Sequence, residues 1–266
     1  MFDSGLGGLS IVRALIDLLP DEHLLYFGDT ARFPYGDKSP EELRRFSLEI
    51  VAGLFGQAKM VVIACNSATA AALPTLQTVL TTPILGVIEP GVRAALQVTR
   101  GRIGVIGTRA TIASGAYEQA VAATRSDVRL TTLACPGFVE LVEAGDVDSP
   151  IAHRLVEETL APLLSAAIDT LVLGCTHYPH LGRLIGEVMG RDVVLISSSE
   201  ETAFEVRHIL EQTGTVRPPL RGPAPRTFIT SGDEATFAAL GRRFLGPDLE
   251  TVHSWSWSTS VPSRAI

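Results

Sequence analysis

Short apolar runs alternate with longer segments of helical periodicity along most of this chain. The runs fall at residues 24–27, 60–64, 84–87, 103–106, 171–173 and 193–196. Between such runs, residues 39–55 and 151–167 carry apolar side chains at helical spacing, and Ser39 before Pro40 is a good N-cap. Short apolar runs without polar alternation are typical of strands buried on both faces. The alternation therefore predicts an α/β fold, with parallel sheets covered by helices.

Parallel sheets bind ligands at the carboxyl ends of their strands, where loops lead into helices. Three such junctions carry unusual residues, at 2–8, 64–69 and 174–179, and the last two contain Cys65 and Cys175. A fourth junction, at 106–111, has the same form without a cysteine. We expect the functional residues at these junctions.

The two cysteine junctions resemble each other. Residues 61–67 and 171–177 each contain three aliphatic side chains, a small residue, a cysteine and polar followers, and the copies lie 110 residues apart. The glycine-rich junctions after Phe2 and Ile106 repeat in the same order. This pattern predicts an internal duplication: two pseudo-symmetric three-layer α/β units whose mainly parallel sheets face each other across a cleft.

The boundaries of the units follow from the duplication. The predicted units are 1–90 with about 205–250, carrying Cys65, and 91–204, carrying Cys175. The triplet Glu89, Pro90 and Gly91 is a natural hinge between them. Three features are expected in the C-terminal part: a proline-rich surface loop at 217–225, a late strand at 227–232 followed by a helix through Phe244, and a flexible tail at 251–266.

Composition excludes several classes of protein. The formal net charge of −7 argues against attraction of nucleic acid by a general positive field. No apolar run approaches the roughly 18 residues of a membrane span, and no signal peptide follows Met1. The three cysteines, Cys65, Cys135 and Cys175, cannot all pair, and Cys135 is predicted to be an inert buried residue. We therefore expect a cytoplasmic protein with reduced thiols, and no membrane or direct nucleic-acid partner.

Cys65 and Cys175 together indicate proton transfer. A thiol has an ordinary pKa of about 8.5, and a helix N-terminus further stabilises its thiolate. Moving a proton from one face of a carbon to the other requires one such group on each face. Two matching cysteines on facing units meet this requirement. The nearby polar side chains that suit an α-carboxylate and an ammonium group are Ser4, Asn66, Ser67, Thr69 and Thr176.

Other chemistries explain these residues less completely. Acyl transfer by Cys175 and His177 stays open, but it leaves Cys65 unexplained. Two cysteines and one histidine at these spacings match no common zinc site, so no metal is expected. Pyridoxal phosphate requires a lysine, and neither Lys38 nor Lys59 falls at the carboxyl end of a strand. The sequence therefore favours chemistry without a cofactor.

Four segments of the chain resemble the signatures of bacterial glutamate racemases, in the same order and at matching spacing. They are DSGLGG at 3–8, GDTARFPYG at 28–36, ACNSA at 64–68 and GCTHYP at 174–179, and CPGFVELVE at 135–143 resembles a further segment of that family. The resemblance extends over nearly the whole chain, from residue 2 to residue 244. Four motifs in register are far more specific than any one of them. On these motifs the chain is similar to the glutamate racemases of the aspartate/glutamate racemase superfamily.

The resemblance implies an isomerase that interconverts L- and D-glutamate without a cofactor and supplies the D-isomer for peptidoglycan, and so for cell-wall biogenesis and cell shape. Cys65 and Cys175 would be its two acid/base thiols. Asp3 would assist Cys65, whereas Glu143 and His177 would assist Cys175. The residues implied for substrate binding are Asp3, Ser4, Tyr35, Gly36, Asn66, Ser67, Thr176 and His177. The family also links Asp29 to the site, less firmly.

The resemblance implies partners as well. Glutamate would be the small-molecule substrate. Some members of the family form dimers and some bind DNA gyrase, so a homodimer and a gyrase interaction are further expectations. Two alternatives stay open: a racemase of a related acid, such as aspartate or hydantoin, and a non-catalytic binding protein on the same scaffold. An assay with aspartate beside glutamate would distinguish the first alternative from a glutamate racemase.

The chain departs from the family pattern at its start. Family members usually place a short apolar strand before the Phe-Asp-Ser-Gly segment, whereas only Met1 precedes Phe2 here. Loss of a central strand would leave the neighbouring strands unpaired and Asp3 poorly anchored. We therefore expect the true start to lie upstream, with Met1 representing a misassigned alternative initiation codon.

Overall fold

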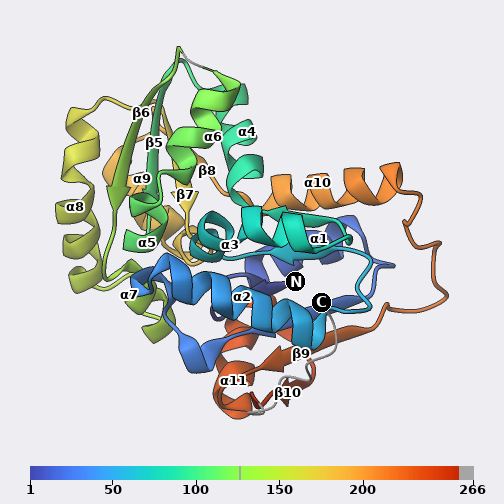
Figure 1. Ribbon diagram of the computed structural model, residues 1–266. Coiled ribbons are helices and arrows are strands. Elements are labelled where there is room, and N and C mark those ends of the chain that lie inside the picture. The colour runs from blue at the N-terminus through green and yellow to red at the C-terminus, as the bar shows by residue number, and fades with distance from the viewer. Residues whose placement is uncertain (126, 258–266) are drawn as a thin grey trace.

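Two separate parallel sheets organise the computed structural model, which describes residues 1–125 and 127–257 (Figure 1). The first sheet has the strand order β10-β9-β2-β1-β3-β4, and the second has the order β6-β5-β7-β8. Every neighbouring pair of strands in the two sheets is parallel. The strands of the first sheet are β1 (Phe2–Asp3), β2 (Leu24–Gly28), β3 (Val61–Ile63), β4 (Ile84–Gly86), β9 (Arg226–Thr230) and β10 (Val252–Ser254). Those of the second are β5 (Arg102–Gly107), β6 (Arg129–Ala134), β7 (Thr170–Gly174) and β8 (Val194–Ile196).

Helices cover both faces of each sheet, so that each sheet with its helices forms a three-layer lobe. In the first lobe one face carries α1 (Leu9–Leu18), α10 (Ser199–Gln212) and α11 (Glu234–Leu245), and the other carries α2 (Pro40–Leu54) and α3 (Asn66–Val79). In the second lobe one face carries α4 (Ile88–Val98) and α6 (Ala116–Thr124), and the other carries α7 (Phe138–Ala144), α8 (Pro150–Ser165) and α9 (Gly182–Met189). Short connections are α5 (Arg109–Ala113) and the 3-10 turns η1 (Thr30–Arg32), η2 (Tyr35–Asp37), η3 (Tyr178–Leu181) and η4 (Gly246–Asp248). This arrangement confirms the predicted α/β class with parallel sheets.

The two sheets share one strand order, as the predicted duplication requires. The order β2-β1-β3-β4 in the first lobe corresponds to β6-β5-β7-β8 in the second, and the first lobe adds β9 and β10 at one edge. Cys65 follows β3 and Cys175 follows β7, so the two cysteines stand at equivalent places. The limits of the two predicted units, at residues 90 and 204, stay a prediction.

Local chemistry explains where α2 begins. The Ser39 hydroxyl accepts a hydrogen bond from the Glu42 N–H at 3.3 Å, and the Glu42 carboxylate accepts one from the Ser39 N–H at 2.9 Å. This reciprocal pair is a capping box, and Pro40 at the first helical position has no N–H to leave unpaired. The helix therefore starts where the sequence predicts. The next element of the chain is β3, the strand that Cys65 follows.

Strand β1 is short but well anchored. Phe2 pairs with Phe27 on one side and with Ile63 on the other, so β1 lies between β2 and β3. The Phe2 carbonyl accepts from the Ala64 N–H at 2.8 Å, and the Asp3 carbonyl accepts from the Asp29 N–H at 3.0 Å. The expectation of unpaired neighbours and a poorly anchored Asp3 is therefore wrong, because two residues suffice to bridge the central strands.

Two sequence-based expectations about the fold are corrected by the structure. The predicted hinge at residues 89–91 lies in the first turn of α4, where a proline is tolerated because the N–H groups of a first turn have no helical partner. Strand β6 was not predicted, because two threonines interrupt the apolar residues of its sequence RLTTLA and leave no continuous apolar run. It is the edge strand of the second sheet, and edge strands require less apolar burial.

The predicted tail at 251–266 also begins with ordered structure. Strand β10 (Val252–Ser254) pairs with β9, and Trp255 and Trp257 pack against the first lobe. The serine- and threonine-rich composition does not predict this strand. The strand forms by pairing with β9, which lies more than 20 residues earlier in the chain. Residues 258–266, the rest of the predicted tail, lie outside the described residues. The proline-rich stretch 217–225 is largely exposed and without regular structure, as predicted.

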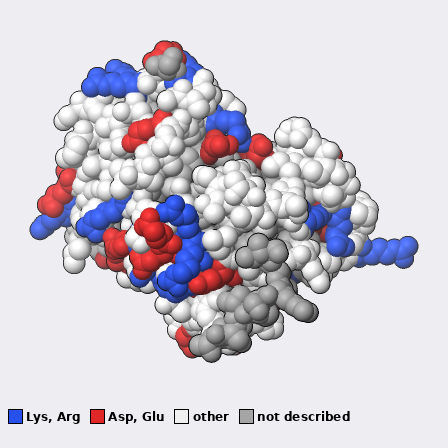
Figure 2. All heavy atoms as spheres, in the orientation of Figure 1, with Lys and Arg blue, Asp and Glu red and all other residues white. Residues whose placement is uncertain are grey.

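The surface carries both signs of charge. Figure 2 shows acidic and basic side chains interspersed on the face drawn, with both signs close together near the start of α2. Within the described part of the chain, no helix is long and apolar enough to cross a membrane.

Candidate active site

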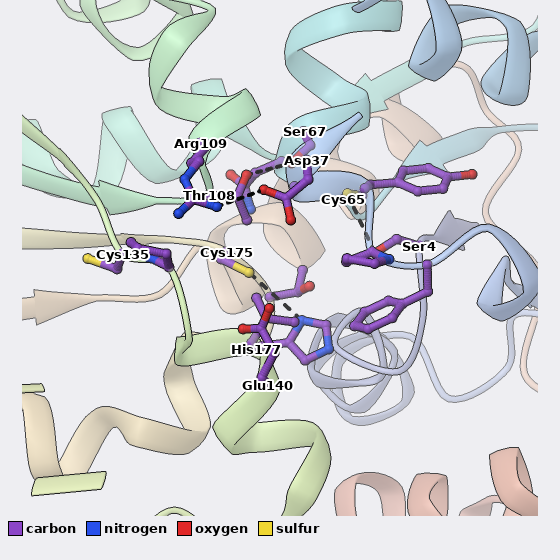
Figure 3. A pocket seen from close by; sticks show the side chains of 18 of the residues that line it. Ser4, Asp37, Cys65, Ser67, Thr108, Arg109, Cys135, Glu140, Cys175 and His177 are labelled. Carbon is purple, nitrogen blue, oxygen red and sulfur yellow. Dashed lines mark hydrogen bonds and ion pairs between the residues drawn. The ribbon is translucent and has the colours of Figure 1, made fainter. Parts of the chain in front are cut away.

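Cys65 and Cys175 line one cavity between the two lobes (Figure 3). Cys65 is the N-cap of α3, and Cys175 directly follows β7. Their side chains are nearly enclosed, with 6% and 7% of the residue surface exposed. The cavity has a volume of about 50 Å³. The predicted site residues that line it are Ser4, Tyr35, Gly36, Cys65, Asn66, Ser67, Cys175, Thr176 and His177.

The surroundings of Cys65 favour its protonated form. Burial raises the pKa of the Cys65 thiol well above its ordinary value, and the carboxylate of Asp3 raises it further. The Cys65 sulfur lies 4.0 Å from the Ser4 hydroxyl oxygen. Cys65 is therefore a protonated thiol, which can donate its proton to a neighbouring atom.

Cys175 belongs to a chain of polar groups that runs back into the second lobe. Its sulfur lies 3.8 Å from Nδ1 of His177, and Nε2 of His177 lies 2.7 Å from a carboxylate oxygen of Glu143. Burial alone would lower the pKa of His177, but the hydrogen bonds to Cys175 and Glu143 raise it to about 10. His177 is therefore a cation at neutral pH, with one N–H directed to the sulfur and the other to Glu143.

Asp3 and Glu143, predicted to assist the thiols, do not line the cavity. Asp3 is completely buried, and its carboxylate accepts from the N–H groups of Ser4 and Gly8 at 2.8 and 2.6 Å and from the Thr176 hydroxyl at 3.2 Å. It thereby joins the loop after β1 to the loop after β7. Glu143 stands behind His177. Each carboxylate supports a residue that does line the cavity, so direct contact of Asp3 with substrate stays a prediction without support from this geometry.

Tyr35 is held at the cavity wall by Asp29. The Tyr35 hydroxyl donates to a carboxylate oxygen of Asp29 at 2.5 Å. The same oxygen accepts from Nε of Arg32 at 2.6 Å, and the other accepts from the Ser231 hydroxyl at 2.7 Å. Asp29 is itself fully buried. Its link to the site is therefore indirect, through the orientation of Tyr35.

Asn66 and Ser67, in the first turn of α3, bind groups of the second lobe. The Asn66 side-chain oxygen accepts from the Tyr117 hydroxyl at 2.8 Å, while its buried amide nitrogen has no hydrogen-bond partner within the described residues. The Ser67 hydroxyl lies 2.9 Å from that of Thr108 and 3.1 Å from that of Thr111. These contacts close the cavity on the side of α5.

Several cavity residues were missed by the sequence reasoning. Thr108 and Arg109 come from the fourth strand-to-helix junction, at 106–111, from which no individual site residue was predicted. Arg109 forms an ion pair at 3.1 Å with Asp37, which lies beside the predicted Tyr35 and Gly36. The remaining missed residues are Phe33, Pro34, Cys135, Pro136, Gly137, Val139, Glu140 and Gly174.

Cys135 lines the cavity but has the character of a structural residue. Its thiol donates to the Leu133 carbonyl at 3.8 Å, and its carbonyl accepts from the Tyr178 hydroxyl at 3.1 Å. Burial, together with nearby Cys175, raises the pKa of Cys135 to about 12. Within the described part of the chain, no group of three His, Cys, Asp or Glu side chains could hold a metal ion.

Known proteins match the chain over most of its length. Residues 9–203 match the family model described as Asp/Glu/Hydantoin racemase. The chain belongs to this family. Within this family's fold, the chain places Cys65 and Cys175 on the wall of one cavity between its two lobes.

Racemases of known name are similar to the whole chain. The glutamate racemase of Geobacter metallireducens is 48% identical over 258 residues, which cover 96% of this chain and 95% of that protein. The structure of a glutamate racemase isoform from Bacillus anthracis superposes with a TM-score of 0.91 at 41% identity, covering 97% of this chain and 96% of that one. The glutamate racemase of Francisella tularensis, solved in complex with D-glutamate, superposes with a TM-score of 0.88 at 32% identity, covering 97% and 95%. These comparisons confirm the predicted resemblance and the predicted class of enzyme, an amino-acid racemase.

Proposed function

We propose that this racemase interconverts L- and D-glutamate by passing the α-proton between Cys65 and Cys175, without a cofactor. The observation that carries the proposal is the placement of the two thiols, at equivalent positions of two lobes and on the wall of one cavity. The named relatives support glutamate as the substrate. D-glutamate made in this way would supply peptidoglycan synthesis.

The two thiols differ in their surroundings, which suggests how one turnover begins. Burial and the Asp3 carboxylate raise the pKa of Cys65, which holds it as a thiol, whereas the ring of His177 lies 3.8 Å from the Cys175 sulfur and would offset its charge when Cys175 acts as the base. The Cys175 thiolate takes the α-proton of a substrate whose C–H bond faces it, and the electron pair moves into the α-carboxylate. The Cys65 thiol then gives its proton to the opposite face. The product leaves with inverted configuration, and the enzyme now has a Cys65 thiolate and a Cys175 thiol, which suits the reverse reaction.

Neutral hydrogen-bond donors would bind the substrate. The hydroxyls of Ser4 and Ser67 and the amide of Asn66 line the cavity and suit carboxylate groups, while the Thr176 hydroxyl, which donates to Asp3, can accept from the substrate ammonium group. The Asn66 amide nitrogen is buried and offers two N–H groups. Tyr35 and Gly36 form the wall nearest to Asp37 and Arg109. His177 would balance the negative charge that develops when Cys175 is a thiolate.

The test is exchange of the α-hydrogen in deuterated buffer, with L- or D-glutamate and no added cofactor. A two-thiol mechanism predicts deuterium in the product from the first turnovers, whereas recovered substrate keeps its α-hydrogen. Cys65→Ala and Cys175→Ala should each lose racemisation by at least about 100-fold, because one face of the carbon then has no acid or base. Cys135→Ala is the matched control, because it removes a thiol that lines the same cavity but takes no part in the proposed proton transfer.

Three other outcomes would change the proposal. Deuterium in recovered substrate as fast as in product would indicate a single base. Turnover of aspartate in preference to glutamate would change the substrate but keep the mechanism. Binding of glutamate by calorimetry, with no exchange in the folded protein, would indicate a non-catalytic binding protein.

The cellular setting of the enzyme is also part of the proposal. We expect a cytoplasmic location, because peptidoglycan precursors that contain D-glutamate are built there. Rescue of a strain that requires D-glutamate would test the physiological role, and the Cys65→Ala variant should fail to rescue it. Homodimerisation and binding of DNA gyrase stay predictions from the family, and neither is needed for the chemistry.

A further inference from the structure

The segment after β10 packs against the loop that carries Tyr35. The Trp255 N–H donates to the Thr230 carbonyl at 2.7 Å, which continues the pairing of β10 with β9. Two residues further, the Trp257 ring meets the Phe27 ring edge to face, with centroids 5.8 Å apart. A segment that the sequence predicts to be a tail thus reaches the middle of the first lobe.

Trp257 also covers the guanidinium group of Arg32. The guanidinium carbon lies 3.9 Å from the centroid of the Trp257 ring and 4.2 Å from that of Phe46. The Arg32 side chain is 16% exposed. A flat cation between two aromatic rings is attracted by both and loses rotational freedom about its long side chain. Trp257 therefore helps to fix the plane in which Arg32 offers its N–H groups, together with Phe46 and with Glu49, whose carboxylate accepts from Nη1 of Arg32 at 2.5 Å.

Arg32 connects Trp257 to the cavity wall through Asp29 and Tyr35. Its Nε donates to Asp29 at 2.6 Å, and Asp29 accepts the hydroxyl of Tyr35 at the same oxygen. Asp29 also donates its backbone N–H to the carbonyl of Asp3. Four side chains in contact, Trp257, Arg32, Asp29 and Tyr35, thus connect the C-terminal segment to the cavity wall.

We propose that Trp257 is a positioning residue for the substrate pocket, acting through Arg32 and Asp29 on Tyr35. Its ring contacts are with Phe27, Arg32 and Trp255 rather than with either thiol, although it packs against the apolar cluster that also contains Cys65. The inference rests on the proposed function, since its kinetic test uses glutamate. Its expected effect is on substrate binding, measured as KM, rather than on proton transfer, measured as kcat.

The first test compares two replacements of similar bulk. Trp257→Leu keeps apolar packing but removes the ring face over Arg32, and it should raise KM for D-glutamate about three- to tenfold with kcat within about twofold. Trp257→Phe keeps a ring face and should restore KM to within about twofold of wild type. Trp255→Phe is the control from the same segment: the Trp255 ring lies edge to face with Trp257, with centroids 6.3 Å apart, and phenylalanine keeps an aromatic ring there while leaving the contact of Trp257 with Arg32 in place.

A double-mutant cycle decides whether the effect travels through Asp29 and Tyr35. Tyr35→Phe removes the hydroxyl that binds Asp29. If Trp257 acts through this hydrogen bond, Trp257→Leu should add little to the KM of the Tyr35→Phe enzyme. Full multiplication of the two effects would overturn the proposed route, and an unchanged KM in Trp257→Leu would overturn the role of Trp257 itself.

The two tryptophans of the chain, Trp255 and Trp257, give a second measurement that does not need turnover. In the Trp255→Phe variant, Trp257 is the only tryptophan, so its emission reports whether the ring stays packed. Tyr35→Phe and Arg32→Lys should shift this emission towards that of an exposed indole; no shift in either would contradict the coupling. Absence of α-hydrogen exchange in the wild type would instead contradict the proposed function. The emission measurement would still test the coupling of Trp257 to Tyr35, because it does not require turnover.

Discussion

At the scale of single residues, the site separates the two thiols by their neighbours. Cys65 lies near the Asp3 carboxylate, which opposes a second negative charge and raises the pKa of the thiol. Cys175 lies near His177, whose pKa is raised to about 10 by its hydrogen bonds despite burial. In the proposed mechanism, two chemically identical side chains would therefore start a turnover in different roles.

Glu143→Gln tests the His177 side of this difference. Removal of the carboxylate charge should lower the pKa of His177 from about 10, because one of the groups that stabilise its cation is lost. Activity that needs the cation persists below that pKa and is lost as pH rises through it, so the alkaline limb of kcat against pH should move to lower pH. We also expect kcat at neutral pH to fall at least about tenfold.

The matched control for this prediction is Glu140→Gln. Glu140 lies on the same helix, α7, and lines the same cavity, but its carboxylate has no hydrogen bond to His177 among those of the described residues. Its replacement should leave the alkaline limb in place. An equal shift in both variants would mean that general charge in the cavity, rather than the Glu143–His177 hydrogen bond, sets the pH profile.

At the scale of elements, loops that follow the carboxyl ends of strands in different lobes meet across the cleft. The loop after β1 contributes Ser4 and Gly7, and the loop after β7 contributes Cys175, Thr176 and His177. A Cβ atom at Gly7 would lie 2.3 Å from the Thr176 hydroxyl and 2.7 Å from Nδ1 of His177. Only a residue without a side chain permits this approach, which explains one glycine of the DSGLGG motif in physical terms.

Gly7→Ala should therefore damage the site more than the fold. The added methyl group displaces His177 and Thr176, and displacements near 1 Å cost about 100-fold in rate. We expect kcat/KM to fall by about that factor while the circular dichroism spectrum stays that of the wild type. Gly56→Ala is the control, because a Cβ at Gly56 meets nothing within 4 Å. Full activity in Gly7→Ala would show that the two loops separate during turnover.

At the scale of the whole molecule, polar contacts join the two lobes around the cavity. Three of these contacts are the hydrogen bonds Asp3–Thr176, Ser67–Thr108 and Asn66–Tyr117. The ion pair between Asp37 and Arg109 adds a fourth contact, and its side chains are 55% and 63% exposed. Exposed ion pairs are weak and are screened by salt, so this one can open and close readily.

Breaking this ion pair should loosen the closed cavity. Asp37→Asn and Arg109→Gln should each raise KM for glutamate about two- to fivefold at low ionic strength, and the double variant should be no worse than either. The difference from wild type should shrink in about 0.5 M salt, because screening already weakens the pair. Steady-state kinetics at two salt concentrations measures this.

The control is an exposed ion pair that lies within one helix, Arg44–Glu41, whose atoms are 2.8 Å apart. Glu41→Gln should leave KM unchanged at both salt concentrations. If Asp37→Asn lowered KM while Arg109→Gln raised it, the ion pair would compete with the substrate for Arg109, and the guanidinium would bind substrate instead of closing the cavity.

The sequence by itself determined the parallel sheets, the start of α2 and the two cysteine junctions. These features depend on periodicity and on spacings of a few residues, which physical rules connect directly to local structure. Seven of the predicted cavity residues lie at the predicted strand-to-helix junctions, and two more, Tyr35 and Gly36, were predicted through the family resemblance.

The remaining features depend on tertiary structure: the edge strands β6 and β10, the contacts of Asp3 with Thr176 and of Glu143 with His177, and the places of Phe33, Thr108 and Arg109 in the cavity wall. It also brought Trp257 onto Arg32, 225 residues earlier in the chain. Contacts of this kind form between segments with no local pattern in common. They depend on which loops meet once both sheets are packed, and that is a property of the folded chain.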